Sequence, residues 1–460
     1  MRSFADSNGD GVGDLRGVID RLGYLESLGI DALWLSPVTV SPDKDWGYDV
    51  SDYYDVQPAL GTLDDVDELI ADAGRRGIRI VLDLVPNHTS DRHAWFREAR
   101  GSRAAPRRDW YVWADAPNNW KSAFGGGPAW TLDSASGQYY LHSFLPEQVD
   151  LNWWNEDVRG AFDEIFRFWL DRGVAGFRLD VAHAIVKERT LRDRGEGEDD
   201  VLVDLDETYA VQRRWRALAD RYDTDRVLLG ETWVMDLDRL ARFYGDGTNQ
   251  LHLAFNFPFT FADFTADALR GVVERTEEVI PKRAWPVWTL SNHDIVRFPT
   301  RMCGGDRRKV RCALLALLTL RGTPVLYYGD ELGLAQVEIA KEVERDIAGR
   351  DGARTPMPWN GEWNEPWLPL DRSTSVEAQD GDPGSILELA RELIRRRRAS
   401  DDLLSGAYRS LDAPDGVWAY ARGEGTTVAL NLSDAEASFA GERLEPWQGV
   451  LVQPAGSMRT

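Results

Sequence analysis

The chain has 460 residues and a formal net charge of −23, and hydrophobic and charged residues make up 43% and 28% of it. This composition excludes a short peptide module and wholesale disorder, and it allows a large buried core. The acidic balance repels nucleic-acid phosphates over most of the surface, so we expect no nucleic-acid partner.

The two cysteines, Cys303 and Cys312, are too few for a disulfide framework and lack the CxxC spacing of a zinc site. No apolar run reaches the roughly 18 to 20 residues of a membrane span, and the best candidate runs from Cys312 to Leu320. The stretch from Met1 to Asp10 shows no basic head followed by an apolar block, which a signal peptide would have. We therefore expect a cytoplasmic protein with no membrane partner, either a monomer or a weak homo-oligomer.

Apolar runs bounded by Gly, Pro and Asp alternate with amphipathic stretches, which predicts repeated β-α units. The predicted helices are Asp14 to Leu28, Asp64 to Arg75, Asn155 to Arg172 and Ser385 to Arg398. The predicted strands are Ala32 to Leu35, Ile78 to Val85, Gly176 to Val181, Val227 to Thr232, Leu251 to Phe257, Val287 to Ser291 and Val325 to Tyr328. A (β/α)₈ barrel needs one strand more, and that strand would have to lie before Ser3.

The predicted fold is an α/β protein with a (β/α)₈ TIM barrel, apparently without its first strand, formed by residues 1–87 and 156–400. Residues 88–155 are rich in Trp, Gly, Asn and Pro and far exceed a βα loop of about 2 to 6 residues. They predict an inserted subdomain B after strand three. The charged stretches Lys187 to Glu207 and Glu338 to Arg350 predict long loops on the same face. Short alternating runs in residues 401–460 predict a small C-terminal antiparallel β-domain.

Charged residues lie at or just after the carboxyl ends of four predicted strands, where a barrel enzyme has its chemistry. The motifs are DLVPNH with Asp83 and His88, GFRLD with Arg178 and Asp180, GETW with Glu231, and SNHD with His293 and Asp294. Any one of these carboxylates taken alone is more often a helix cap or a surface group. Together, after apolar runs whose interior excludes charge, they indicate one common site.

Converging carboxylates beside basic residues are typical of glycoside hydrolysis, in which one acid stays protonated while another is ionised and nucleophilic. Arg178 precedes Asp180 by two residues, points to the same side of the strand, and is expected to keep that carboxylate ionised. Asp180 is therefore the better nucleophile. Glu231 has no basic residue in its strand and is expected to act as the proton donor. Asp294, next to His293, is expected to bind sugar hydroxyls and to favour the distorted ring.

These motifs resemble those of the α-amylase family of retaining glycoside hydrolases, specifically its oligo-1,6-glucosidase and α-glucosidase branch. The resemblance runs from Arg2 to the C-terminal β-domain. It implies that Asp180 is the nucleophile, Glu231 the general acid/base and Asp294 the transition-state stabiliser, with no cofactor for catalysis. The residues implied to bind the reacting glucose ring are His88, Arg178 and His293.

Further segments resemble the substrate pocket of this branch. DWGYDVSDY places Asp45 at the position of the pocket acid and Tyr48 at that of a stacking tyrosine, and GRDGARTPMPW places Arg354 at that of the pocket arginine. An Asp45–Arg354 bridge would close the site into a pocket and favour release of one glucose from a non-reducing end. The alternative is that Asp45 and Arg354 form an exposed ion pair that contributes little to stability. Other positions that match the pocket lining are Phe124, Phe144 and Gln148.

The segment DSNGDGVGD spaces Asp6, Asn8, Asp10 and Asp14 with glycines between them, a pattern that offers oxygen ligands to a hard cation. It resembles the first loop of oligo-1,6-glucosidases, which implies a structural Ca²⁺ or Mg²⁺ ion with the backbone carbonyl of Val12 as a further ligand. The alternative is a solvated acidic turn.

We expect a retaining exo-acting α-glucosidase that releases glucose from short isomalto- or malto-oligosaccharides through a β-glucosyl ester on Asp180. Val181, directly after that residue, resembles the α-1,6-acting members, whereas threonine at this position goes with α-1,4 preference. The segment QVDLN departs from the QPDLN usual in the branch. An alternative within the family is a trehalose- or sucrose-converting isomerase or transglucosidase. The non-enzymatic alternatives are a catalytically inactive barrel homologue and a truncated, non-functional product.

Overall fold

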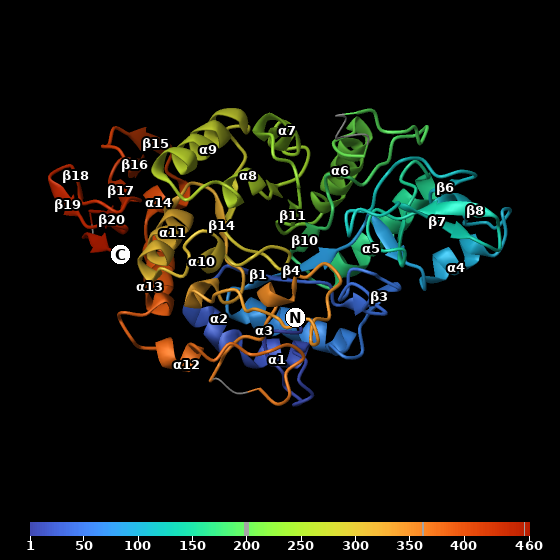
Figure 1. The fold of residues 1–460 in the computed structure, drawn as a ribbon, viewed down its shortest axis with the longest axis horizontal. Helices are drawn as coiled ribbons and strands as arrows, with labels where there is room; N and C mark the ends of the chain where they lie inside the picture. Colours follow the sequence, from blue (N-terminus) through green and yellow to red (C-terminus); the bar gives the residue numbers. More distant parts are fainter. Residues whose placement is uncertain (197–201, 361–362, 455) are drawn as a thin grey trace.

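A computed structural model of the protein describes residues 1–196, 202–360, 363–454 and 456–460. At its centre is a wall of parallel strands, surrounded by helices (Figure 1). One sheet has the order β1 (Ala32–Leu35), β4 (Arg79–Leu84), β10 (Gly176–Leu179), β11 (Val227–Gly230) and β12 (Leu253–Ala254). β13 (Val287–Thr289) pairs with β14 (Thr323–Val325), and a parallel bridge from Phe255 to Val287 joins this pair to the sheet. The predicted barrel fold is confirmed, with seven parallel strands in the described residues.

Only β1 has the predicted bounds, and two predicted strands differ from the structure by more than one or two residues at their ends. The run Leu251 to Phe257 forms only the short β12, because Asn256 accepts a hydrogen bond from the Phe259 backbone and starts helix α8 (Phe257–Thr260). The run Val325 to Tyr328 is placed too late, since β14 ends at Val325. The backbone N–H of Tyr327 instead donates to Asp330, at 3.1 Å, in a turn that leaves the sheet.

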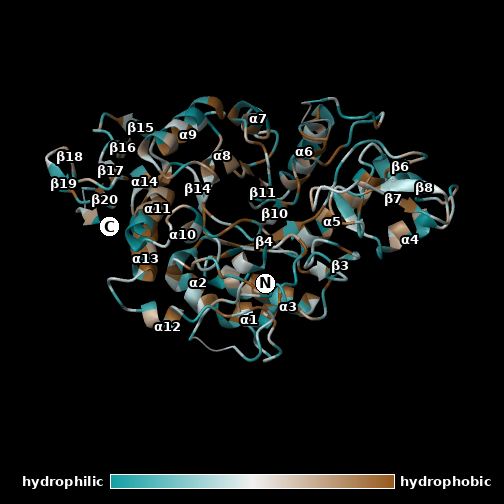
Figure 2. Cartoon of the chain, viewed as in Figure 1, coloured by the Kyte–Doolittle hydropathy of each residue, from teal (hydrophilic) through white to brown (hydrophobic). Residues whose placement is uncertain are grey.

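Local capping explains where the helices begin. The predicted helix Asp14 to Leu28 is split at Arg21 into α1 (Leu15–Asp20) and α2 (Leu22–Leu28), and the Asp14 side chain caps α1. α3 (Leu63–Arg75) starts with a capping box between Thr62 and Asp65. The remaining barrel helices are α5 (Glu156–Asp171), α6 (Asp206–Ala219), α7 (Leu237–Arg242), α9 (Ala266–Val279), α10 (Phe298–Arg301), α11 (Arg307–Thr319), α12 (Val376–Gln379) and α13 (Ile386–Arg398). Figure 2 shows hydrophilic residues on the outer helices, for example α6.

Residues between β4 and β10 form small antiparallel sheets at one end of the molecule (Figure 1). β5 (His88–Ser90) pairs with β9 (Gln148–Asp150), which ties both ends of the segment to the barrel. The remaining elements are α4 (Ala94–Arg100), the 3₁₀ turn η1 (Arg108–Trp110), β6 (Trp113–Ala114), β7 (Trp130–Asp133) and β8 (Gln138–Leu141). A separate hairpin after β1 consists of β2 (Thr39–Val40) and β3 (Asp52–Val56).

The C-terminal residues form an antiparallel sheet at the opposite end (Figure 1). After α14 (Asp401–Ser405), its strands are β15 (Tyr408–Leu411), β16 (Val417–Arg422), β17 (Thr426–Asn431), β20 (Gln448–Val452) and β21 (Met458–Arg459). A hairpin of β18 (Ala437–Phe439) and β19 (Glu442–Leu444) lies between β17 and β20 in the chain.

The apolar run from Cys312 to Leu320 belongs to α11, whose residues from Cys312 to Thr319 are all buried. α11 packs on α13 on one side and on β17 and β20 of the C-terminal sheet on the other. Its apolar character therefore follows from burial inside the protein. Within the described part of the chain, no helix has the length and apolarity that crossing a membrane requires.

Candidate active site

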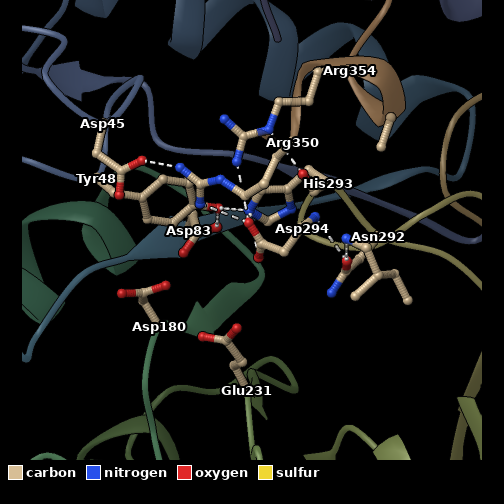
Figure 3. Close-up of polar contacts among 12 residues, drawn as sticks. Asp45, Tyr48, Asp83, Asp180, Glu231, Asn292, His293, Asp294, Arg350 and Arg354 are labelled. Atoms are coloured by element: carbon tan, nitrogen blue, oxygen red, sulfur yellow. Dashed lines mark hydrogen bonds and ion pairs between the residues drawn. The ribbon is translucent and has the colours of Figure 1, made fainter. Parts of the chain in front are cut away.

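The predicted catalytic residues lie together at the carboxyl ends of the parallel strands (Figure 3). Asp180 directly follows β10, Glu231 directly follows β11, and Asp294 lies in the loop after β13. Asp180 and Glu231 are only 6% and 5% exposed. The parallel sheet thus brings together three carboxylates that lie far apart in the sequence.

One buried guanidinium group holds the acidic residues in place. Arg178 Nη1 contacts Asp180 Oδ1 at 2.7 Å and Asp83 Oδ1 at 3.0 Å, while Nη2 contacts Glu231 Oε2 at 3.0 Å. The Arg178 side chain is 1% exposed, so little water screens these contacts. Because the two ends of one planar group contact Asp180 and Glu231, the separation and orientation of these carboxyls are fixed together.

The electrostatics of Asp180 differ from the prediction. Burial and the negative charge of Glu231 raise the pKa of Asp180 well above its ordinary value, and Arg178 offsets only part of this effect. Arg178 contacts Asp180 as predicted, but this single cation is shared with Asp83 and Glu231 and does not by itself lower the pKa of Asp180. Glu231 also accepts hydrogen bonds from Val181 N at 2.9 Å and Trp233 Nε1 at 2.8 Å.

The contact between Val181 and Glu231 depends on an unusual backbone conformation. Val181 has φ of 48°, in the left-handed region that β-branched residues rarely adopt. Such a residue costs on the order of 1–3 kcal/mol, and strain of this kind clusters at functional sites. Here the conformation directs the Val181 N–H at the carboxyl of Glu231 immediately after Asp180.

Asp294 has a more positive environment. Arg350 Nη1 lies 2.9 Å and Arg354 Nη2 3.1 Å from Asp294 Oδ1, and His293 Nε2 lies 3.3 Å from Oδ2. Burial alone would raise the pKa of Asp294, but the contact with His293 and the charges of Arg350 and Arg354 outweigh burial and lower that pKa below its ordinary range. The backbone N–H of Asp294 also donates to Asn292 Oδ1 at 2.9 Å. Asp294 is therefore an ionised carboxylate opposite the Asp180–Glu231 pair (Figure 3).

The predicted bridge between Asp45 and Arg354 is not formed. Asp45 Oδ1 instead contacts Arg350 Nη2 at 2.5 Å, and Arg350 also contacts Asp346 and Asp294. Arg354 follows the 3₁₀ turn η3 (Asp351–Ala353), so it reaches Asp294 and donates from Nε to the His293 carbonyl at 2.8 Å. The prediction chose the wrong arginine of GRDGAR, because sequence order does not show which side chain the turn directs toward Asp45.

The other predicted pocket residues form a connected wall. Gln148 Nε2 donates to Asp45 Oδ2 at 3.0 Å and lies 3.1 Å from His88 Nε2. The Phe144 ring packs edge-on against His88 and Phe124 at centroid distances of 5.4 and 5.2 Å. Burial lowers the pKa of the His88 imidazole to about 4, so it is neutral at pH 7. Phe124 and Phe144 are half-buried, whereas His88 and Gln148 are buried.

Tyr48 connects this wall to the catalytic group. Its ring stacks on His293 with a centroid distance of 5.3 Å, and its hydroxyl donates to Asp83 Oδ2 at 2.9 Å. Burial and the nearby cations Arg354 and Arg178 lower the pKa of His293 to about 3. His293 is therefore a neutral hydrogen-bonding group at pH 7.

Sequence reasoning missed three residues as site members. Asp83 stood in the motif DLVPNH but received no role, although it receives hydrogen bonds from Arg178 and Tyr48. Trp233 stood in GETW and donates to Glu231. Arg350 lies at the end of a stretch predicted as a loop. The sequence feature that could have identified it as a site residue is the presence of two nearby acids, Asp346 and Asp351.

A buried lysine supports the segment that carries His88. Lys187 Nζ donates to Asn87 Oδ1 at 2.5 Å and to the Ala184 carbonyl at 2.6 Å, and lies 3.2 Å from Asp150 Oδ2. Burial lowers the pKa of Lys187, and the charge of Asp150 opposes this effect. Lys187 was expected only as the start of a charged loop. It instead connects the loop after β10 to β9.

In the predicted metal loop, side-chain oxygens accept hydrogen bonds from the backbone N–H groups of the loop itself. Asp6 accepts hydrogen bonds from the backbone N–H groups of Asn8, Gly9 and Gly11. In the same way the Asn8 side chain accepts from Asp10, and that of Asp10 accepts from Val12. Carboxylate and amide oxygens of this kind are the ligands that a hard cation prefers. Asp14 caps α1, and no group of three or more His, Cys, Asp or Glu residues suited to metal occurs in the residues that the structure describes.

Comparison with known proteins gives this geometry a context. The family model described as "Alpha amylase, catalytic domain" matches residues 1–406. The chain belongs to the α-amylase family.

Within the α-amylase family, one relative is the "Probable alpha-glucosidase" of Rhizobium meliloti (strain 1021), 39% identical, with 97% of this chain and 90% of the relative covered. Another is the "Oligo-1,6-glucosidase" of Heyndrickxia coagulans, 35% identical, covering 95% and 91%. A solved structure of an α-glucosyl transfer enzyme matches with a TM-score of 0.90 and 36% identity, covering 100% of this chain and 95% of that one. The chain is therefore an α-amylase-family glycoside hydrolase, an enzyme as predicted.

Proposed function

We propose that this enzyme is a retaining exo-acting α-glucosidase that releases glucose from the non-reducing end of short isomalto- and malto-oligosaccharides. The observation that carries the proposal is the Arg178 guanidinium group, which contacts Asp180 and Glu231 at once. Retaining glycosidases need two carboxyls close together, one as nucleophile and one as acid and then base. The names of the α-glucosidase and oligo-1,6-glucosidase relatives support the same substrate class.

In the proposed reaction, Asp180 attacks the anomeric carbon while Glu231 gives its proton to the leaving glycosidic oxygen. The C–O bond to the leaving group breaks, and a β-glucosyl ester forms on Asp180. Water then attacks the same carbon, Glu231 takes the proton, and the ester bond to Asp180 breaks. The two roles require that Asp180 is ionised for attack and that Glu231 holds the proton it gives to the leaving oxygen.

Asp294 is the proposed transition-state stabiliser. Positive charge develops on the sugar ring in the oxocarbenium-like transition state, and an ionised carboxylate fixed nearby stabilises it. The lowered pKa of Asp294 supports this role, since the group stays charged at any working pH near neutrality.

The ion pair of Asp45 with Arg350 supports exo action. Both side chains are at least nine-tenths buried, and the Arg350 guanidinium packs over the Phe124 ring at 4.8 Å. We infer that these residues, with His88 and Gln148, enclose the terminal glucose, so that a long chain cannot pass through the site.

The substitution Asp180→Ala tests the proposal. It should abolish glucose release from p-nitrophenyl α-glucoside, whereas Asp412→Ala, an exposed aspartate of the C-terminal sheet region, should keep full activity. NMR of the first product should show α-glucose, because two displacements retain the configuration. Full activity of Asp180→Ala, or β-glucose as the first product, would exclude the retaining assignment.

A second candidate within the family is a transglucosidase or a trehalose- or sucrose-converting isomerase. The similarity to the α-glucosyl transfer enzyme favours it, because the same glucosyl ester can pass to a sugar hydroxyl in place of water. A product profile on maltose, isomaltose, sucrose and trehalose separates the two. Free glucose from maltose and isomaltose supports the glucosidase, and rearranged disaccharides from sucrose and trehalose support the isomerase.

We also propose that the loop of Asp6 to Asp14 binds a structural Ca²⁺ or Mg²⁺ ion, with side-chain oxygens of Asp6, Asn8, Asp10 and Asp14 and the Val12 carbonyl as ligands. The ion would hold the loop ahead of α1 and would take no part in catalysis. Thermal unfolding with CaCl₂, MgCl₂ or EDTA tests this proposal. The ion should raise Tm for the natural chain and leave Asp10→Ala unchanged.

A cytoplasmic location and a monomeric or weakly associating state remain proposals. The two cysteines, Cys303 and Cys312, are buried and free, which is compatible with a reducing compartment. Cell fractionation and light scattering test these two proposals.

A further inference from the structure

Asp49 is a buried carboxylate that the proposed reaction does not use. It follows Tyr48 in the hairpin between β2 and β3 and is 0% exposed. Its hydrogen-bond donors among the described residues are the Ser41 hydroxyl and two backbone N–H groups, and no cationic side chain is among them. A buried charge is costly unless its hydrogen bonds are made, so the groups that make them indicate what Asp49 does.

The hydrogen bonds that Asp49 accepts come from the turn ahead of it. Ser41 Oγ donates to Asp49 Oδ1 at 2.8 Å, Lys44 N donates to Oδ2 at 3.0 Å, and Asp45 N donates to Oδ1 at 3.0 Å. The Ser41 hydroxyl in turn accepts from Asp43 N at 2.9 Å. Burial raises the pKa of Asp49 to about 6, and these hydrogen bonds favour its charged form, in which both oxygens accept. Three consecutive backbone N–H groups are therefore held by Asp49, directly or through Ser41.

The backbone of this turn has an unusual conformation. Asp43 and Trp46 have φ of 60° and 50°, in the left-handed region that residues other than glycine rarely adopt, and Gly47 follows with φ of 107°. Residues 41–50 belong to neither a helix nor a strand, so no regular backbone pairing fixes them. Conformations of this kind persist only where surrounding contacts determine them. The carboxylate of Asp49 provides such contacts at the middle of the turn.

The same turn carries Asp45 into the candidate active site. Asp45 Oδ1 contacts Arg350 Nη2 at 2.5 Å, and Oδ2 accepts from Gln148 Nε2 at 3.0 Å (Figure 3). The side chain of Asp45 thus faces the residues proposed to enclose the terminal glucose, while its backbone N–H is bonded to Asp49. A displacement of the turn would therefore move the Asp45 carboxylate relative to Arg350 and to the bound sugar.

We propose that Asp49 is a positioning residue, which fixes the turn of residues 43–47 and thereby the position of the Asp45 carboxylate against the terminal glucose. The inference rests on the proposed function for the identity of the sugar. Asp49 is fully buried, so it acts through Asp45 and does not touch the substrate. Asn at position 49 would keep the volume but set an amide NH₂ against a backbone donor of the turn, which would lose its acceptor.

A double-mutant cycle of Asp49→Asn and Asp45→Asn tests this proposal, with kcat/KM for p-nitrophenyl α-glucoside as the readout. The matched control is Asp55→Asn, an exposed aspartate on β3 of the same hairpin, which should behave as the natural chain. Asp49→Asn should lower kcat/KM by about 10- to 100-fold, because a binding group misplaced by about 1 Å can cost that much. In the Asp45→Asn background the same change should have an effect of less than about threefold, since its target is already lost. An equal loss in both backgrounds would overturn the proposal, as would natural kcat/KM for Asp49→Asn.

Hydrogen exchange of the Lys44 and Asp45 amides separates this proposal from the proposed function. Exchange should be about tenfold faster in Asp49→Asn and unchanged in Asp55→Asn, whether or not the enzyme cleaves the glucoside. If the natural chain releases no glucose, the proposed function fails, and natural exchange rates in Asp49→Asn would then overturn the role of Asp49. Ser41→Ala removes one of the three hydrogen bonds and replaces Asp49→Asn in both tests if that variant does not fold.

Discussion

Arg350 is the residue whose substitution tests the proposed site most directly. It is 10% exposed and contacts Asp45, Asp294 and Asp346, whose side chains are 5%, 18% and 2% exposed. Removing one partner of a buried ion pair costs about 3 to 5 kcal/mol, so Arg350→Met should lower the free energy of unfolding by that order. Loss of electrostatic support for Asp294 should also lower kcat by about 10²- to 10³-fold.

The pH dependence of Arg350→Met follows from the pKa of Asp294. In the natural chain this pKa is below its ordinary value, because Arg350 and its cationic neighbours outweigh burial. The charged carboxylate contributes stability that is fully present above the unfolded pKa of about 3.9 and is lost as pH falls through the folded pKa. Without Arg350 the folded pKa rises. The acidic limb of kcat/KM and the acid unfolding transition should therefore both move to higher pH.

Urea unfolding between pH 2 and pH 8 measures the effect on stability, and kcat/KM with p-nitrophenyl α-glucoside over the part of that range in which the enzyme is active measures the effect on catalysis. Arg345→Met is the matched control, since Arg345 is exposed and lies in the same loop. Arg345→Met should behave as the natural chain. Natural kcat/KM and an unchanged acidic limb in Arg350→Met would refute the electrostatic role given to Arg350.

Three further substitutions have distinct expected results. Lys187→Met leaves Asp150 buried without its cation and should cost about 3 to 5 kcal/mol in urea unfolding, and an unchanged midpoint would contradict this. Tyr24→Phe removes a 2.8 Å hydrogen bond to the buried Glu331 and should cost about 1.5–3 kcal/mol, while natural stability would show that water replaces the hydroxyl. Val181→Thr should raise the ratio of maltose to isomaltose turnover several-fold, and a constant ratio in initial-rate assays would remove this residue from linkage choice.

The barrel was predictable because its strands are short apolar runs between clear turn signals. Ala32–Leu35 has the predicted bounds, and α5 differs by one residue at each end. Errors occurred where a side chain ends a strand early, as Asn256 does by capping α8. The strands of residues 88–155 were not predicted, since β5 and β9 pair across 57 intervening residues and no local pattern encodes that pairing.

Within the site, residue positions were more predictable than their electrostatics. Strand ends converge in any parallel barrel, so Asp180, Glu231 and Asp294 were expected to meet. The protonation of Asp180 depends on how one guanidinium is shared among three carboxyls, which a spacing of two residues cannot show. The choice between Arg350 and Arg354 likewise depends on the turn at η3.

The two-sided burial of α11 bears on attempts to produce a minimal enzyme. The family match ends at residue 406, which suggests a cut before the C-terminal sheet. Such a deletion would strip α11 of β17 and β20 and remove the bonds that Tyr420 and Arg422 make to Thr319. The shortened protein would expose the apolar face of α11 to solvent, so we expect it to aggregate on expression even though every catalytic side chain is retained.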